Sequence, residues 1–392
     1  MSKLDELIQK LCPDGVEYRK IGEVTNYEQP SKYIVRNTDY RDEYETPVLT
    51  AGQSFVLGYT NESDGIYPAS KATPVIIFDD FTAAFKWVNF PFKVKSSAMK
   101  MITANESQLL IRFLFHWMGA LNYSSTEHTR LWIGTYSEFK IPVPPLPVQR
   151  EIVRILDNFT ELTAELTAEL TARKQQYAYY RDKLFDSYSE VDTKKIGKLT
   201  RVFSASRVHK DEWTNEGVPF FRSSDVVSAF NGGKNTRGKA YISRELYERL
   251  SAKSGKIEKD DILVTGGGTI GIPYIIPNDA PIYVKDADLI CIKRNEHILS
   301  KFLYHYFCST KFRDYLKSIT HNATIAHYTI TQIENTPVPV FPLKEQARIV
   351  SILDSFDTLC TDLSSGLPAE IEARQKQYKY YRDKLLTFTP AN

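Results

Sequence analysis

The chain has 392 residues, enough for two or three domains, and its 42% apolar and 25% charged residues are ordinary for a globular protein. No apolar run reaches the roughly 18 residues that a membrane-spanning helix needs, and the amino terminus lacks the apolar core of a signal peptide. The net charge of +2 argues against a polycationic tail, although a basic face can be balanced by acidic residues elsewhere. We therefore expect a cytoplasmic protein that does not contact membranes.

The first segment, residues 1–145, has the pattern of a mixed α/β domain. Its short β-rich runs TPVLTAG, FVLGYT, TPVIIFDD and FKWVNFPFKV are bounded by Gly, Asp, Asn and Pro. An apolar stretch at 108–121 predicts a helix after these strands. The segment ends in a proline strap, PVPPLP at 142–147, which is extended because each proline disfavours helix in the residue before it.

A long helix is predicted to follow the strap. From Ile152 to Leu184 the apolar positions recur at steps of three and four, which makes a heptad seam with one four-residue stutter. A helix from Gln149 to Asp186 would be roughly 60 Å long at 1.5 Å per residue. Inside it lies TELTAELTAELTA, a tetrad repeat at 160–172 that consists mostly of good helix formers. We interpret the tetrads as a spacer whose length matters more than its chemistry.

The second half repeats this organisation. Residues 188–342 open with TKKIGKLTRV, as the first segment opens with YRKIGEVTNY, and carry β-rich runs, a predicted helix at 299–319 and the strap PVPVFP. QARIVSILDSF then repeats QREIVRILDNF, and QYKYYRDKLL near the end repeats QYAYYRDKLF from the middle of the chain. The second seam has the same spacing with one additional step of four. Within it, Gly366-Leu367-Pro368 predicts a break, because glycine ends helices and proline begins them.

Two helices with similar narrow seams predict an intramolecular antiparallel coiled coil with an approximate two-fold axis. The alternative is that each helix docks on its own domain or on another chain. The predicted fold class is α+β, with two mixed α/β domains joined by two long helices. The predicted boundaries are 1–145 for the first domain, 146–187 for the first helical region, 188–342 for the second domain and 343–392 for the second helical region.

No motif in the sequence predicts catalysis. GGGTIG at 266–271 formally matches a dinucleotide fingerprint, but Pro273 and a strand-like run follow, so a tight turn is expected instead. There is no Walker-type motif, no Asn-Pro-Pro-Tyr tetrapeptide and no histidine pair with metal-ligand spacing. His116 and His305 fall on apolar helix patterns and are interpreted as core residues. We therefore expect a non-enzymatic chain that binds no metal and no cofactor.

Basic, polar and aromatic residues gather in loops of both domains, where they can contact DNA phosphates and base edges. For each one, an ordinary solvated surface residue is the competing interpretation. Two related modules on a two-fold strut suit a bipartite site in duplex DNA, since half-site spacing mirrors protein geometry. Lys100 belongs to the same basic set. The candidate DNA contacts are Lys32, Tyr33, Lys71, Lys86, Trp87, Lys95 and Arg130 in the first domain, and Arg207, Lys210, Arg222, Ser223, Lys234, Arg237, Lys239, His321 and Asn322 in the second.

The straps with their QREIVRILD and QARIVSILD helix starts, the TAEL tetrads and the two YYRDKL endings closely resemble the DNA-specificity subunit of type I restriction–modification systems. The resemblance covers essentially the whole chain. It implies that each domain reads one half of a bipartite site in double-stranded DNA. The Gly-Leu-Pro break departs from the expected continuous helix.

The resemblance also implies a division of labour. The chain would hold two methyltransferase subunits, which bind S-adenosylmethionine and methylate an adenine at N6 in each half-site. Restriction–translocation subunits, which use ATP and Mg, would join the assembly. The rival hypotheses are a stand-alone bipartite DNA-binding regulator without enzymatic partners and an enzyme whose site the sequence does not reveal.

Overall fold

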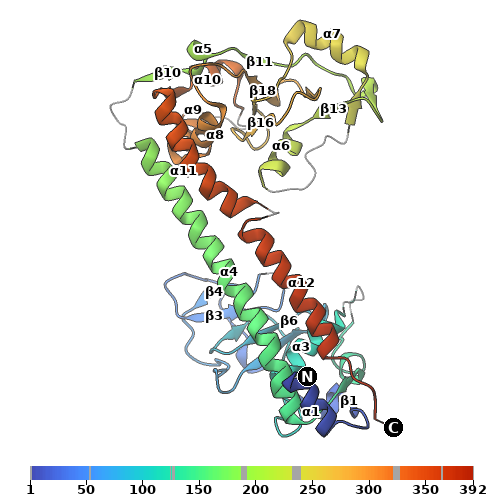
Figure 1. The fold of residues 1–392 in the computed structure, drawn as a ribbon. Coiled ribbons are helices and arrows are strands. Elements are labelled where there is room, and N and C mark those ends of the chain that lie inside the picture. Colours follow the sequence, from blue (N-terminus) through green and yellow to red (C-terminus); the bar gives the residue numbers. More distant parts are fainter. Residues whose placement is uncertain are drawn as a thin grey trace. The chain divides into compact units, whose positions relative to one another are not determined.

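The computed structural model describes residues 2–52, 54–123, 125, 129–186, 192–231, 240–320, 327–362 and 365–391. The chain forms two compact units. Unit 1 comprises Met1–Glu165 and Glu372–Asn392, and unit 2 comprises Leu166–Ile371. Each unit therefore contains one globular part, one stretch of a long central helix and one stretch of the carboxyl-terminal helices (Figure 1). No helix in the described parts is both long and apolar enough to cross a membrane.

Unit 1 is built on two small sheets. One has the strand order β2-β8-β5-β6 and is antiparallel throughout, and the other has the order β4-β3-β7. β5 is apolar along its length because both of its faces are buried: Ile76 and Phe78 pack towards α3, whereas Val75 and Ile77 pack towards the second sheet. The elements of the globular part are α1 (Lys3–Leu11), β1 (Tyr18–Lys20), α2 (Ile21–Val24), β2 (Thr25–Glu28), η1 (Ser31–Tyr33), β3 (Thr46–Leu49), β4 (Val56–Thr60), β5 (Val75–Asp79), β6 (Phe85–Val88), β7 (Lys93–Val94), β8 (Met99–Ala104), α3 (Ile111–Leu121), η2 (Tyr136–Glu138) and β9 (Lys140–Pro142).

Unit 2 repeats this plan with different contents. Its sheets have the strand orders β11-β18-β15-β16 and β12-β14-β13-β17. β15 is again buried on both faces, with Ile262 and Val264 in one apolar cluster and Leu263 in the other. The elements are β10 (Thr193–Lys195), α5 (Ile196–Leu199), β11 (Val202–Ser204), η3 (Lys210–Glu212), β12 (Trp213–Thr214), β13 (Val218–Phe221), α6 (Ser223–Phe230), β14 (Ala240–Ile242), α7 (Arg244–Ser254), β15 (Ile262–Thr265), β16 (Pro273–Ile275), β17 (Tyr283–Val284), β18 (Leu289–Ile292), α8 (Ser300–Cys308), α9 (Thr310–Thr320), α10 (Ile330–Asn335) and β19 (Pro337–Pro339).

The shared frame predicted from the repeats is present in both units. The opening segment of each globular part pairs antiparallel with its own proline strap: β1 with β9, and β10 with β19. A single helical turn, α2 or α5, follows each opening strand. The predicted fold class, two mixed α/β domains joined by long helices, is therefore confirmed.

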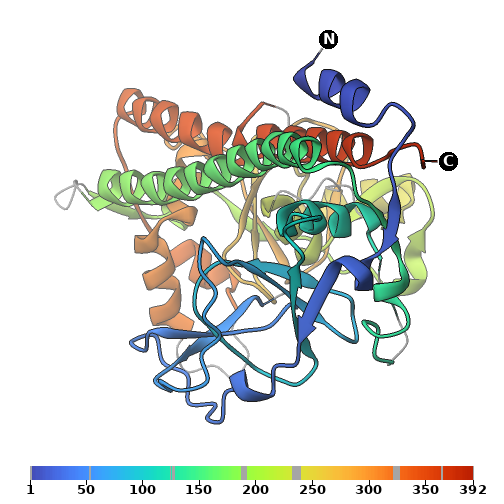
Figure 2. The same ribbon diagram turned by 90° about the horizontal axis from the view of Figure 1, so that it is seen from below.

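The central helix α4 (Leu146–Asp186) is 41 residues long and unbroken. It begins three residues before the predicted start, within the proline strap. Pro147 is tolerated there because the first backbone N–H groups of a helix have no partner within the helix, so the N–H that proline lacks is not needed. Within unit 1 its first half lies beside α12 (Leu367–Leu385), and within unit 2 its second half lies beside α11 (Leu343–Thr361), in each case antiparallel (Figure 1, Figure 2).

The predicted break in the second helical region is confirmed, because α11 ends at Thr361 and α12 begins at Leu367. Glycine is required at position 366 because the backbone leaves no room for a Cβ atom. A Cβ on Gly366 would lie 2.7 to 2.9 Å from the carbonyl oxygens of Asp362, Thr358 and Leu359.

Two other sequence predictions can be compared with the fold. The helix expected over 299–319 is divided into α8 and α9 at Ser309, whose hydroxyl donates to the Tyr306 carbonyl oxygen at 2.7 Å. The tight turn expected at GGGTIG is confirmed: it joins β15 to β16, and Gly268 and Gly271 both have positive φ.

The start and the end of the chain meet within unit 1. The Val16 amide donates to the Thr389 carbonyl oxygen at 2.9 Å, and the Ala391 amide donates to the Val16 carbonyl oxygen at 2.9 Å. Gly15 has a φ of +99°, and a Cβ there would lie 2.7 Å from the Pro390 carbonyl oxygen. The carboxyl-terminal tail is thus fixed to the segment that precedes β1.

Candidate functional site

A buried histidine joins the globular part of unit 1 to both of its long helices. His116 of α3 is 1% exposed. Its Nε2 lies 2.8 Å from Oδ1 of Asp157 on α4, and its Nδ1 lies 2.9 Å from the hydroxyl of Tyr378 on α12. Because an ionised carboxylate only accepts, Nε2 carries the ring proton and Nδ1 accepts from Tyr378. One imidazole therefore fixes three helices, an arrangement that we call the histidine bridge.

Unit 2 contains the same bridge. His305 of α8 is fully buried, its Nε2 lies 2.9 Å from Oδ1 of Asp354 on α11, and its Nδ1 lies 2.9 Å from the Tyr177 hydroxyl on α4. Each aspartate also forms an ion pair with a cation: Arg112 donates to Asp157 at 2.7 Å, and Lys301 pairs with Asp354.

The histidine bridges explain why the decapeptide occurs twice. The first copy, at the end of α4, supplies Tyr177 to the bridge in unit 2, where α11 begins. The second copy, at the end of α12, supplies Tyr378 to the bridge in unit 1, where α4 begins. Sequence reasoning placed both histidines in the core, which their burial confirms, but it missed their polar role. The signal that could have revealed it is the recurrence of RFLFHW at 112–117 as KFLYHY at 301–306.

Further equivalent contacts surround each bridge. Phe159 stacks on Tyr381 with ring centroids 5.3 Å apart, and its counterpart Phe356 stacks on Tyr180 at 5.7 Å. The fully buried Gln149 donates to the Pro144 carbonyl oxygen at 2.7 Å, as Gln346 donates to a strap carbonyl in unit 2 at 2.8 Å. The repeated sequence therefore forms the same set of contacts in both units, and in each unit these contacts join the globular part to the paired helices.

The His116 bridge makes a prediction about pH. Burial lowers the pKa of His116 below its ordinary 6.5, although the hydrogen bond to Asp157 opposes the shift and the nearby Arg112 and Arg382 add to it. The unfolded chain therefore binds a proton that the folded unit does not, and stability should fall as the pH drops below about 6.5. Urea unfolding at pH 7.5 and 5.5 measures this loss, which His116→Gln should remove.

His297 offers a matched control, because it is an exposed histidine elsewhere in the chain. His297→Gln should keep the parent's pH dependence. The Asp157 carboxylate does not contribute to the pH dependence between pH 7.5 and 5.5. Burial raises its pKa, but the contacts with His116 and Arg112 outweigh burial and hold the pKa below its ordinary 3.8. An unchanged acid slope in His116→Gln would contradict the assignment.

The candidate DNA contacts of the first domain differ in environment. Lys71 and Lys95 are exposed, Lys86 is half-buried, and none of these three has an acidic partner among the described residues. Lys32 pairs with Glu28 at 2.8 Å, and Arg130 lies 3.4 Å from Asp80.

The aromatic candidates of this domain are more enclosed than the cations. Tyr33 is 8% exposed, and its hydroxyl donates to Glu28. Trp87 packs beneath the Arg112 guanidinium, 4.6 Å from the ring centroid. Lys86 and Trp87 are neighbours on β6 and so point to opposite faces of the sheet. The expectation for Lys100 is wrong, because this lysine is fully buried and pairs with Asp80 at 2.9 Å.

In the second domain, Arg207 and Lys210 are exposed. Arg222 stands at the amino-terminal end of α6, with its Nε 3.4 Å from Asp225, and the Ser223 hydroxyl donates to the Asp288 carbonyl oxygen at 3.0 Å. Nothing in the structure tests these residues as DNA contacts, so they stay predictions. Five further candidates lie outside the described residues: Lys234, Arg237, Lys239, His321 and Asn322.

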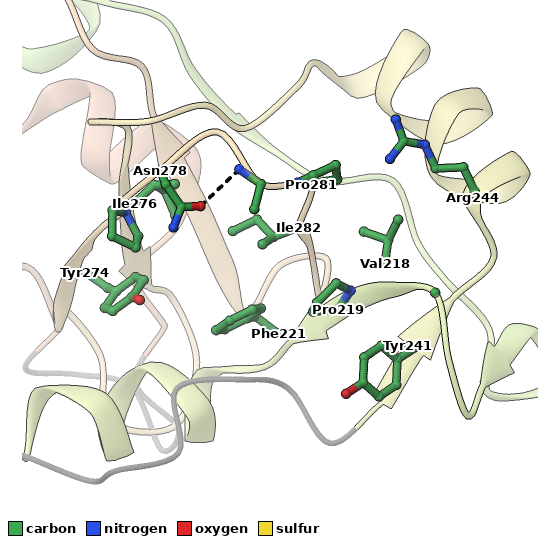
Figure 3. Close-up of a pocket in the computed structure, with 13 residues that line it drawn as sticks. Val218, Pro219, Phe221, Tyr241, Arg244, Tyr274, Ile276, Asn278, Pro281 and Ile282 are labelled. Atoms are coloured by element: carbon green, nitrogen blue, oxygen red, sulfur yellow. Dashed lines mark hydrogen bonds between the residues drawn. The ribbon is translucent and has the colours of Figure 1, made fainter.

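A hollow of about 590 Å³ lies in unit 2, between β13, α7 and the segment that follows β16 (Figure 3). Phe221, Tyr241 and Tyr274 line it together with several prolines and aliphatic residues, and Arg244 stands at one side. Among the described residues that line it there is no histidine, cysteine or carboxylate, and its ionisable side chains are those of Tyr241, Arg244 and Tyr274. Among the described residues there is also no cluster of side chains suited to hold a metal ion.

A family model, described as the type I restriction modification DNA specificity domain, matches residues 13–173 and again residues 188–373. The chain belongs to this family. Each matched range of the specificity domain covers one globular part and the first part of the helical region after it. The two matches therefore correspond to the two repeated frames.

Individual members of the specificity family agree with this assignment. The chain is 42% identical over 406 aligned positions to the type I restriction enzyme EcoR124I/EcoR124II specificity subunit of Escherichia coli, covering 99% of this chain and 98% of the relative. It is 32% identical to a putative type I restriction enzyme specificity subunit of Haemophilus influenzae, covering 95% and 96%. The fold also resembles the crystal structure of a type I S subunit from M. genitalium, with a TM-score of 0.58 at 14% identity, covering 95% and 96% of the two chains.

Proposed function

We propose that the chain is the DNA-specificity subunit of a type I restriction–modification complex and reads a bipartite site in double-stranded DNA. The single observation that carries the proposal is the duplicate match to a DNA specificity domain over two equivalent frames. Each globular part reads one half-site. The paired helices join the two parts, and the histidine bridge of each unit fixes how its globular part sits on the helices.

The proposed partners follow from this role. Two methyltransferase subunits bind the chain, and the internal repeat supports this number because equivalent surfaces bind equivalent partners. These subunits bind S-adenosylmethionine and methylate adenine at N6. Restriction–translocation subunits bring ATP and Mg to the assembly. The chain itself binds no cofactor, catalyses no reaction and works in the cytoplasm, where the DNA is.

Reconstitution tests the function. The chain alone should transfer no methyl group from S-adenosylmethionine to DNA, and co-expression with its methyltransferase should give a 2:1 complex that methylates adenine in one bipartite sequence. Radiolabelled methyl transfer and the mass of the purified complex measure both statements. Methyl transfer by the isolated chain would overturn the non-catalytic role, and specific DNA binding without any methyltransferase complex would favour the stand-alone regulator.

Two surface cations test the DNA contacts. Lys86 has no acidic partner in the described structure, so Lys86→Ala should weaken binding evenly across sequences and reduce the salt dependence by about one unit if the lysine contacts a phosphate. Arg222→Ala should cost about 1–3 kcal/mol at one base position if the arginine reads a base edge. Fluorescence anisotropy at several salt concentrations separates these outcomes. Lys317→Ala, at an 80% exposed side chain already paired with Asp314, is the matched control.

A further inference from the structure

A buried ion pair stands at one end of the four-stranded sheet of unit 1. Asp80 directly follows β5 and is 1% exposed, and Lys100 of β8 is fully buried. The ammonium of Lys100 lies 2.9 Å from Oδ2 of Asp80 and donates to Oε1 of Gln29 at 3.1 Å. Because removing two charges from water is costly, apolar side chains of similar volume often stabilise a core as well as such a pair does. Stability alone therefore does not account for the pair.

Asp80 also fixes three consecutive residues of the segment before η2. Nη1 of Arg130 lies 3.4 Å from Oδ2 of Asp80, and the Trp132 amide donates to Oδ1 at 2.8 Å. Between them, the Leu131 amide donates to the Asp80 carbonyl oxygen at 2.7 Å. The guanidinium of Arg130 lies over the ring of Phe81, 5.8 Å from its centroid. Both the backbone and the side chain of Arg130 are therefore held in place.

Arg130 keeps an available charge although it contacts a carboxylate. Its side chain is 55% exposed, and Lys100, at the shorter distance, already neutralises Asp80. In the described part of the chain, Nε and Nη2 of Arg130 have no hydrogen-bond partner. These two nitrogens form one edge of the planar guanidinium, which can donate to two acceptors at once. The contact with Asp80 thus orients the arginine and leaves a bidentate edge for another molecule.

The equivalent point of unit 2 is held by the same backbone contact. Gly266 directly follows β15, and the Tyr328 amide donates to its carbonyl oxygen at 2.9 Å. His327 therefore occupies the position of Arg130, and it is exposed. A Cβ on Gly266 would lie 2.8 Å from the Tyr328 carbonyl oxygen, so no side chain takes the place of Asp80 there. The two domains share the backbone of this point and differ in its side chain, as two domains that read different half-sites require.

Other candidate DNA contacts adjoin the same end of the sheet in each unit. In unit 1, β2 and β5 end here and β6 and β8 begin, with Lys86 on β6 and Lys95 shortly before β8. In unit 2, β11 and β15 end and β18 begins at the corresponding end, and Arg207 follows β11. Arg130 therefore lies at a basic end of its sheet, and that end has a basic counterpart in the second domain.

We propose that Arg130 reads a guanine in the half-site of the first domain, with Asp80 and Lys100 as the positioning residues that hold its guanidinium for this contact. A bidentate contact from arginine to O6 and N7 of guanine is the commonest specific contact in the major groove, and it needs two donors on one edge of the guanidinium. A side chain fixed by packing and by buried partners suits base reading, which depends on precise geometry. The inference rests on the proposed function, because it requires this domain to bind DNA.

Sequencing of methylated adenines in a host that carries the reconstituted complex tests the arginine. Arg130→Ala should relax one G·C position in the half-site of the first domain and leave the other half-site unchanged. Fluorescence anisotropy of the same complex, on duplexes altered at that position, should show that discrimination falls by about 5–150-fold with little change in salt dependence. Arg130→Lys should lose this discrimination as well, because an ammonium lacks the planar fork. An unchanged recognised sequence, or an even loss of affinity with a shallower salt dependence, would overturn the base contact.

A double substitution tests the positioning residues. Asp80→Asn together with Lys100→Met removes both charges, which avoids the unpaired buried charge that either change alone would leave. The new amide oxygen can still accept from the Trp132 amide, whereas the amide nitrogen cannot accept from Arg130. The double variant should lose discrimination at the same G·C position with an unchanged salt dependence, because Arg130 keeps its charge. Adding Arg130→Ala to it should cause no further loss of discrimination.

Glu62→Gln together with Lys93→Met is the matched control, because it removes another buried ion pair of the same domain, with a separation of 2.9 Å. The control should keep the parent's recognised sequence. Undiminished discrimination in the Asp80→Asn and Lys100→Met variant, or its failure to fold, would overturn the positioning role. Absence of bipartite methylation by the parent complex would overturn the proposed function, whereas a parent motif that Arg130→Ala leaves intact overturns this inference alone.

Discussion

Exchanging residues 1–145 for the corresponding domain of another family member is expected to change one half of the recognised DNA sequence and to leave the other half intact. The physical reason is that the contents of this domain differ from those of 188–342, while its frame is closed by its own β1–β9 pair. Each replaced base pair in the old half-site should cost about 1–3 kcal/mol of binding, so three would lower affinity for the parent site by about 3–9 kcal/mol. Sequencing of methylated adenines in a host that carries the reconstituted system measures both halves at once.

The structure adds a condition to this exchange. The incoming domain must supply a histidine equivalent to His116, because Asp157 and Tyr378 stay behind in the recipient. Its amino-terminal segment must also accept the tail that pairs with Val16. The control is the same chimaera with that histidine changed to alanine, which should lose binding at the exchanged half-site first. A chimaera in which both halves of the recognised sequence change would refute independent reading by two domains.

The repeats explain why so much of the architecture could be predicted. Identity between distant segments is independent of local propensity, so the paired straps, seams and decapeptides revealed the two frames directly, whereas the break at Gly366 was predicted from local glycine and proline signals. The division of α8 from α9 was missed because the apolar period continues across Ser309, whose amide and hydroxyl both donate to the Tyr306 carbonyl oxygen at the end of α8. A single-residue cap of this kind has no periodic signal.

The candidate site was harder to predict, because a charge in a sequence does not indicate whether it is neutralised. The sequence does not distinguish Lys86 from Lys100. In the described structure Lys86 has no acidic partner, whereas Lys100 is fully buried and paired with Asp80. The histidine bridges were missed for a related reason. Their partners Asp157 and Tyr378 are far away in sequence and come together only when the two helices pair.

The tetrad segment of α4 offers the other large effect. Its leucines Leu162, Leu166 and Leu170 are half-buried, while most of the residues between them are exposed. The Thr171 hydroxyl donates to the carbonyl oxygen of Thr167, four residues earlier, at 3.0 Å, so this polar group is satisfied by the helix itself. Because the segment depends so little on tertiary contacts, added tetrads should extend the helix without changing either domain.

Inserting Thr-Ala-Glu-Leu after Leu166 should therefore lengthen the unspecified spacer by about one base pair while keeping both half-site sequences. Four residues add about 6 Å of helix and turn it by about 400°, a net rotation of about 40° that keeps the leucine seam nearly in phase. One base pair adds about 3.4 Å and about 35° of duplex, which is similar in rotation. Sequencing of methylated adenines in host DNA measures the spacer directly.

The matched control is an insertion of Thr-Ala-Glu at the same place. Three residues turn the helix by about 300°, so the seam swings by about 60° in the opposite sense and the leucines leave the interface. The two insertions differ by one residue in length but by about 100° in phase, so the three-residue variant should lose methylation of any bipartite site. An unchanged spacer in the four-residue variant would mean that the tetrads are filler, and equal activity of both variants would mean that the seam does not hold the helices in register.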